Sequence, residues 1–125
     1  MENPMKAMIL VTVAVMAGCA TTTPVPADKL SRSQAAVRSA EEMNAASEPR
    51  AALHLKLAKE QLAQAKDFMK EGDNERAKAV LLRAESDGEA ALALARARSA
   101  HAETQKALDT IQEIKAQIQA GGSKS

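Results

Sequence analysis

The chain has 125 residues, which is enough for one small domain and too few for two. Its 17 lysines and arginines nearly balance its 16 acidic residues, and the charges are interleaved, so nucleic acid is not expected as a partner. Alanine makes up about a fifth of the residues, and tryptophan and tyrosine are absent. These features predict an all-α chain with a thin core and no aromatic surface for stacking bases or sugars.

The N-terminus has the pattern of a secretion signal. Lys6 precedes an apolar run of about ten residues, well short of the roughly 20 that a membrane-spanning helix needs. Two small residues, Ala17 and Gly18, then precede Cys19, the only cysteine. We therefore expect a signal peptide over residues 1–18, with cleavage between Gly18 and Cys19.

The sequence Met16-Ala17-Gly18-Cys19 resembles the lipobox of bacterial lipoproteins. The resemblance implies that the Cys19 thiol is alkylated by diacylglycerol and that, after cleavage, the new amine receives an acyl chain such as palmitate. In Gram-negative lipoproteins a residue other than aspartate after the cysteine implies transfer to the outer membrane, and here that residue is Ala20. Two or more acyl chains make attachment effectively permanent, so a lipid-anchored protein facing the periplasm is expected.

A tether is predicted between the lipid and the helical part of the chain. It comprises residues 19–29, and from Ala20 to Asp28 it contains three threonines and two prolines, which favour extended backbone. Nine residues reach up to roughly 30 Å when fully extended. The helical domain is expected to follow over residues 30–120.

A short first helix is predicted from Leu30 to Ala46, where apolar residues recur at spacings of three and four. Asp28 and Ser31 are its alternative caps. The helix should end before Pro49, because proline disfavours helical geometry at the preceding residue and suits the first turn of a new helix.

Two further helices are predicted to form an antiparallel hairpin. The first, from Pro49 to Glu71, should end at Gly72, which suits the left-handed conformation past a helix. The second, from Glu75 to Ala120, is about twice as long, so the first cannot cover its C-terminal half. One continuous helix, with Gly88 permitting a close neighbour, is favoured over a break at Ser86 to Glu89. Residues 121–125 are expected to form a disordered tail.

Ile111, Ile114 and Ile118 form a candidate interaction stripe on the uncovered half of the long helix. Three coverings are open. The first helix can fold over the stripe, a second copy of the chain can pair with it as in a coiled coil, or an unknown envelope protein can bind it.

No catalytic residue, metal site or cofactor is predicted. His54 and His101 have no metal-binding residue at the next helical turn. The glycines and serines do not form a phosphate-binding loop or a nucleophile elbow. The chain is therefore not expected to be an enzyme.

Small-residue spacings in the helical region match those of a known family: Ala58-x₃-Leu62-x₂-Ala65, Gly72-Asp73-x₃-Ala77, Leu81-x₂-Ala84-x₂-Asp87 and the run from Ala91 to Ala97. The chain resembles, from about Leu30 to Arg98, an uncharacterised bacterial lipoprotein family defined by the domain of unknown function DUF4398. The resemblance implies a periplasm-facing helical domain and no particular activity. Together these features predict a non-catalytic structural or protein-interaction module at the outer membrane. The alternatives are a self-associating helical spacer and, less favoured, a small-ligand carrier.

Overall fold

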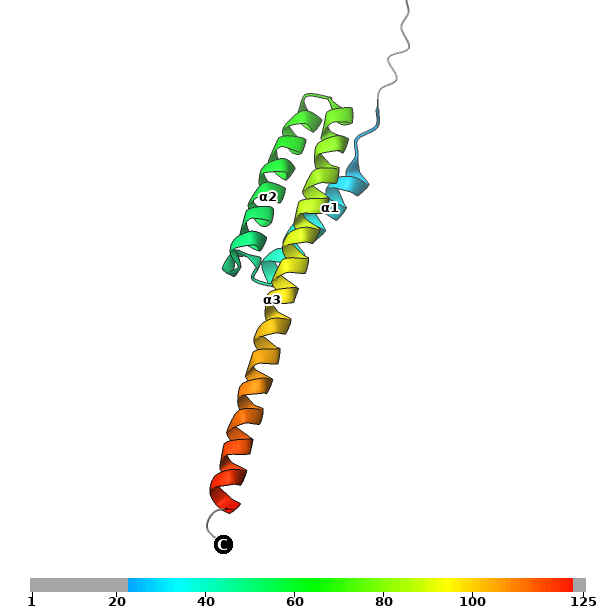
Figure 1. Cartoon of the computed structure of the whole chain (residues 1–125). Helices are drawn as coiled ribbons and strands as arrows, with labels where there is room; N and C mark the ends of the chain where they lie inside the picture. The colour runs from blue at the N-terminus through cyan, green and yellow to red at the C-terminus, as the bar shows by residue number, and fades with distance from the viewer. Residues whose placement is uncertain (1–22, 123–125) are drawn as a thin grey trace, which may run out of the picture.

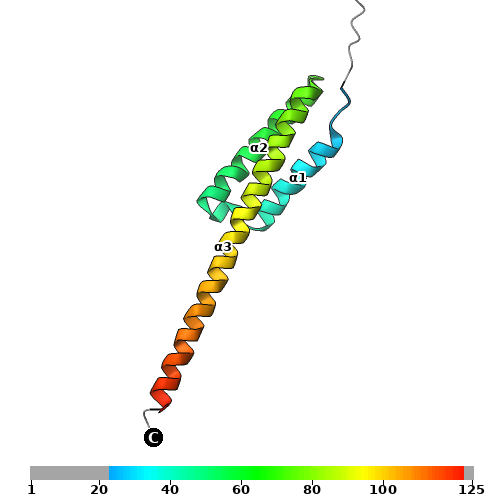
Figure 2. The same cartoon turned by 45° about the vertical axis from the view of Figure 1, so that its right-hand side comes forward.

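The computed structural model describes residues 23–122. This part of the chain contains no strand and is built from α1 (Ala27–Glu42), the short 3₁₀ helix η2 (Ala45–Ser47), α2 (Pro49–Lys70) and α3 (Asn74–Gly122). The hairpin of α2 and α3 also packs against α1, and these three helices form a body at one end of the molecule (Figure 1). The C-terminal half of α3 leaves this body alone (Figure 2). The predicted all-α arrangement, with a short helix and a long C-terminal helix, is confirmed.

Helix α1 lies closer to the N-terminus than its periodicity predicts. It begins at Ala27 rather than Leu30, directly after Pro26, whose ring restricts the backbone. Pro26 occupies the cap position and no side chain caps the helix, so the predicted caps Asp28 and Ser31 are wrong. Asp28 lies in the first turn instead, where its negative charge interacts favourably with the helix dipole.

The end of α1 is set by an asparagine. The helix ends at Glu42 rather than at Ala46, and Asn44 has a left-handed backbone with φ of 53°. Asparagine tolerates this conformation better than most residues do. The chain then forms η2, and the Glu48 side chain accepts a hydrogen bond from the Ala51 amide at the start of α2. This amide lowers the pKa of the Glu48 carboxyl.

The turn between α2 and α3 has the predicted glycine. Gly72 has a φ of +79°, which costs an L-residue with a side chain far more than it costs glycine. The Asp73 amide donates to the Phe68 carbonyl at 2.9 Å and the Gly72 amide to the Met69 carbonyl at 3.2 Å. This is the Schellman pattern that ends many helices. Asp73 then accepts a hydrogen bond from the Arg76 amide at 3.2 Å and caps α3.

The core of the body is thin, as the composition predicts. Most of its buried side chains are alanine, and Leu81 is the one large apolar side chain among the described residues with no exposed surface. Small side chains bury little apolar area each, so the helices gain stability through close approach along their length. Ser33, also fully buried, lies 2.8 Å through its Oγ from the Leu81 carbonyl oxygen and joins α1 to α3.

Gly88 lies at a point of close approach between α1 and α3. Helix α3 runs through Gly88 without a break, which confirms the predicted continuity. A Cβ at this position would lie 2.9 Å from the Ala36 Cβ and 3.2 Å from the Val37 backbone nitrogen. These atoms belong to the backbone of α1 or are fixed directly to it, so the absence of a side chain at Gly88 determines how closely α1 packs.

Replacing Gly88 by alanine should therefore destabilise the body. We expect Gly88→Ala to lower the free energy of unfolding by about 1–2 kcal/mol, because the clash outweighs the better helix propensity of alanine. Urea unfolding followed by circular dichroism measures this change. Gly121→Ala is the control, since no neighbouring atom lies within 4 Å of its added Cβ. An equal or higher stability of Gly88→Ala would contradict the packing described.

Candidate interaction surface

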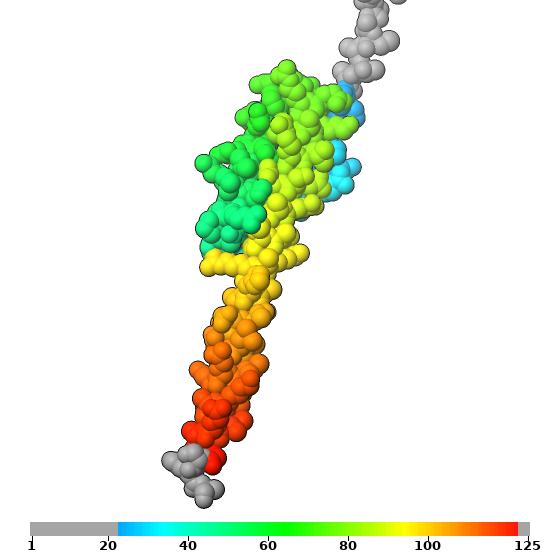
Figure 3. All heavy atoms as spheres, in the orientation of Figure 1, coloured from blue at the N-terminus to red at the C-terminus, as the bar shows by residue number. Residues whose placement is uncertain are grey.

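The C-terminal half of α3 extends away from the body as a single helix (Figure 1). We call residues 97–122 the stem, and every one of these residues is exposed. The space-filling view shows the stem with the thickness of one helix (Figure 3). Its large apolar side chains are unusually accessible for their type, with exposed fractions of 49% for Leu108, 47% for Ile111, 50% for Ile114 and 68% for Ile118. The predicted stripe therefore exists as an open surface.

The first helix does not cover the isoleucines, so this alternative is wrong. Helix α1 has 16 residues and packs beside the first half of α3, where its side chains Val37 and Ala40 are buried. The Gly88 contact with Ala36 holds it there. Within the described residues nothing covers the stripe, and the predicted coverings by a second copy of the chain or by a different protein stay open.

The stripe faces away from the body. A helix turns by about 100° per residue, so the direction of each side chain around the α3 axis follows from its number. The buried residues of α3, which face α1 and α2, include Ala77, Leu81, Ala84, Ala91 and Ala95. The mean direction of all the buried α3 residues and that of the three isoleucines differ by about 140°. A molecule that binds the stripe therefore approaches α3 from the side opposite α1 and α2.

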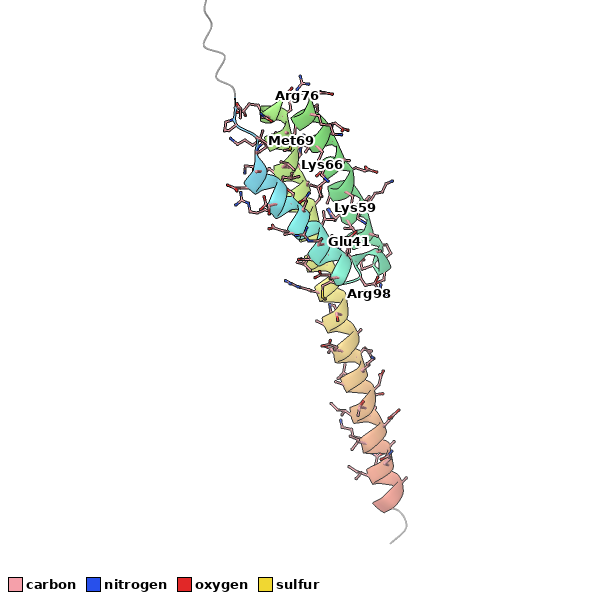
Figure 4. All side chains as sticks on the ribbon, turned by 180° about the vertical axis from the view of Figure 1, so that it is seen from behind. Glu41, Lys59, Lys66, Met69, Arg76 and Arg98 are labelled. Atoms are coloured by element: carbon pink, nitrogen blue, oxygen red, sulfur yellow. The ribbon has the colours of Figure 1, made fainter. Side chains whose placement is uncertain are left out.

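Arg98 lies at the junction of body and stem (Figure 4). Its guanidinium donates to the Ser47 carbonyl oxygen and lies 3.2 Å from the Ser47 Oγ. A second contact in the same view joins α1 to α2, where the Lys59 Nζ lies 2.5 Å from the Glu41 Oε1. Arg98, in the first turn of the stem, thus fixes the corner between η2 and α2 to α3.

The N-terminal residues of the described chain are attached to the opposite end of the body. The Thr23 hydroxyl donates to the Glu75 carboxylate at 2.8 Å, and the Asn74 side-chain amide donates to the Thr23 carbonyl at 2.7 Å. Both partners lie in the first turn of α3, next to the turn that follows α2 (Figure 1). Thr23, which lies within the predicted tether, is therefore held against α3. The predictions for Gly18 and Cys19 lie outside the described residues.

An open groove of about 550 Å³ lies between the residues after Thr23 and the start of α3. Its lining carries both signs of charge, with Lys29, Arg32 and Lys78 near Asp28 and Glu75. The positive charges are partly balanced by these acidic residues, so the groove lacks the strong single-sign field that favours a charged ligand.

A polar network joins α2 to α3, and helical spacing in the sequence does not indicate which residues form it. The Asp87 carboxylate accepts one hydrogen bond from the His54 Nδ1 at 2.8 Å and one from the Gln61 Nε2 at 2.8 Å. Because a carboxylate only accepts, Nδ1 carries the imidazole proton in this contact. His54 and Asp87 are 33 positions apart, so only the antiparallel pairing of the two helices brings them together. The network links α2 to α3 at the same level as Gly88.

Residues 23–122 contain no group of three or more His, Cys, Asp or Glu side chains placed to hold a metal ion. None of the three α-helices combines the length and the hydropathy required to cross a bilayer.

The fold and the exposed surface define a class: a small three-helix body extended by a single-helix stem. The family model described as domain of unknown function (DUF4398) matches residues 28–117. This match covers well over half of the chain, so the protein belongs to that family, as its motifs predict. The match extends past Arg98 and includes most of the stem. No curated protein and no solved structure matches the chain.

Removing the shared acceptor of the polar network should destabilise the hairpin. We expect Asp87→Ala to lower the free energy of unfolding by about 1–3 kcal/mol more than Asp109→Ala does, because His54 and Gln61 lose their partner in a half-buried site. Asp109 is the matched control, since its 3.0 Å hydrogen bond with Gln105 is exposed on the stem. Urea unfolding of both variants gives the comparison, and equal stabilities would show that the network contributes nothing.

Proposed function

We propose that the protein is a non-catalytic outer-membrane lipoprotein that holds its three-helix body close to the lipid and projects its stem into the periplasm to bind protein. The observation that carries this proposal is the position of Thr23 beside the first turn of α3. The proposed lipid-bearing residue, Cys19, precedes Thr23 by four positions. The chain between them spans about 14 Å at most.

The short connection supports one orientation relative to the membrane. The end of the body that carries the α2–α3 turn would lie near the headgroups. Helix α3 starts at this end and has 49 residues, which corresponds to a length of roughly 70 Å. The stem would then form the membrane-distal end of the molecule, with its apolar stripe well beyond the lipid surface.

The exposed isoleucines support a role in binding rather than in folding. Large apolar side chains on a single helix gain nothing from the body, yet burying the exposed part of each one against a partner is favourable by on the order of 1 kcal/mol. An amphipathic helix with anchors at spacings of three and four is a common docking element. The alternative in which the protein serves as a self-associating spacer uses the same surface. The groove at the membrane end is the feature that a small-ligand carrier would need, and its balanced charge argues against that role.

Lipidation at Cys19 is the first test. In the envelope of a Gram-negative host, the mature chain should begin at Cys19 and carry thioether-linked diacylglycerol and an amide-linked acyl chain, visible by mass spectrometry of its N-terminal peptide. Cys19→Ser should incorporate no palmitate, whereas the control Thr21→Ser should be labelled like the wild type. A mature chain with an unmodified Cys19 thiol, or one that begins at another residue, would reject the proposal.

Distance from the bilayer tests the orientation. Lipoprotein carrying one fluorescent donor, at Glu71 or at Gln119, is placed in vesicles with an acceptor dye in the headgroups. Energy transfer should be strong from Glu71, because the short tether holds the α2–α3 turn near the lipid, and weak from Gln119, which lies roughly 70 Å further out along α3. Similar transfer from both positions would mean that the body lies flat or hangs freely.

A further inference from the structure

We infer that the partner of the stem is this chain itself, and that residues 97–122 assemble in a parallel three-stranded coiled coil. The parallel direction of the strands rests on the proposed function, because chains anchored in one membrane through their N-termini all project their stems in the same direction. It names the partner that the proposed function leaves open.

The stem has a heptad seam along its whole length. Ala97, Thr104, Ile111 and Ile118 occupy the a positions, and Ala100, Ala107 and Ile114 occupy the d positions. None of these side chains carries a charge. The isoleucines at both a and d favour three strands over two, because β-branched residues at d pack poorly in a dimer. A seam of this kind fits its own copy, since each isoleucine enters a hole lined by the same residues.

The body leaves room for this assembly. The isoleucine stripe lies on the side of α3 opposite α1 and α2. Three copies joined through the stripe would therefore have their α3 helices at the centre, with α1 and α2 on the outside. If the stripe continued the buried face of α3, the bodies of neighbouring copies would collide before the stems met.

The charges beside the seam permit parallel copies. The e and g positions lie on either side of the seam. In the stem they contain one acidic residue, Glu103, one lysine, Lys115, and one histidine, His101. In a parallel coiled coil a g residue meets the e residue five positions later on its neighbour. Glu103 then meets Leu108, and Lys115 meets Thr110. No pair of like charges faces across the interface, and no block of one charge selects a partner of opposite charge.

The strength of the contact fits anchored copies. Three isoleucines and one leucine per chain, with exposed fractions from 47% to 68%, are a small apolar surface compared with the roughly 800 Å² per partner of a standard stable interface. Association in dilute solution should therefore be weak and reversible. Copies tethered to the same membrane have a raised effective concentration, which turns a weak contact into a populated assembly.

Disulfide scanning of the full chain in the bacterial envelope tests the seam. Single cysteines are introduced at Ile111 or Ile114, and at the control positions Glu113 and Ala116, which lie outside the seam. Mild oxidation should link chains through the seam positions at least about tenfold more than through the controls. Equal linking at all four positions, or linking only at the controls, would overturn the inference. Oxidative linking of the unmodified chain would instead reveal a free Cys19 and so refute the proposed lipid anchor.

Sedimentation equilibrium then gives the number of strands. Every contact described here lies within residues 23–122, so a chain that starts at Ala20 retains the complete body. Its mass should rise with concentration from one chain toward three. Ile114→Asp should move this transition to at least about tenfold higher concentration, because it places a charge in the seam. Ala116→Asp, which adds the same charge outside the seam, should not. A single chain at all concentrations, a limit of two chains, or equal effects of both variants would contradict the three-stranded assembly.

Discussion

The structure depends on a mismatch in helix length. Helix α3 has 49 residues, whereas the helices packed against it have 22 and 16. Packing therefore stabilises its first half, whereas the stem beyond the Arg98 contact projects from the body alone. Since most helical stability in proteins comes from the packing of an apolar face rather than from intrinsic propensity, we interpret a stem with a repeated apolar seam as an element that completes its packing outside the chain.

The body achieves close packing with little apolar bulk. Alanine at most buried positions and glycine at position 88 let the backbones approach, and the buried Ser33 adds a hydrogen bond between α1 and α3. The polar network around Asp87 and the Arg98 contact then fix how far along α3 the other helices lie. These contacts all lie on one side of α3, and this asymmetry gives the molecule a free face that continues into the stem.

Much of this architecture could be predicted from the sequence, because helix periods, Pro49 and Gly72 act locally. The continuity of α3 and the exposed stripe followed from the same patterns. Other features depend on which helix packs where. Helix α1 starts at Ala27 because Pro26 precedes it, and apolar spacing does not indicate this start. The attachment of Thr23 to α3 and the contact of His54 with Asp87 each join residues that are distant in the chain. For the same reason the sequence left open whether α1 covers Ile111, and the structure shows that it does not.

Amide hydrogen exchange along α3 tests the central claim, that the two halves of this helix differ in what stabilises them. In dilute solution, where the chain is a monomer, amides from Ala77 to Ala95 should exchange slowly and those of the stem should exchange much faster, because no packing against other helices protects them. In the lipid-anchored protein at high surface density the stem amides should become protected, while those of the body change little. A stem that is as strongly protected in the monomer as the body would contradict the account, since its helix would then need no partner.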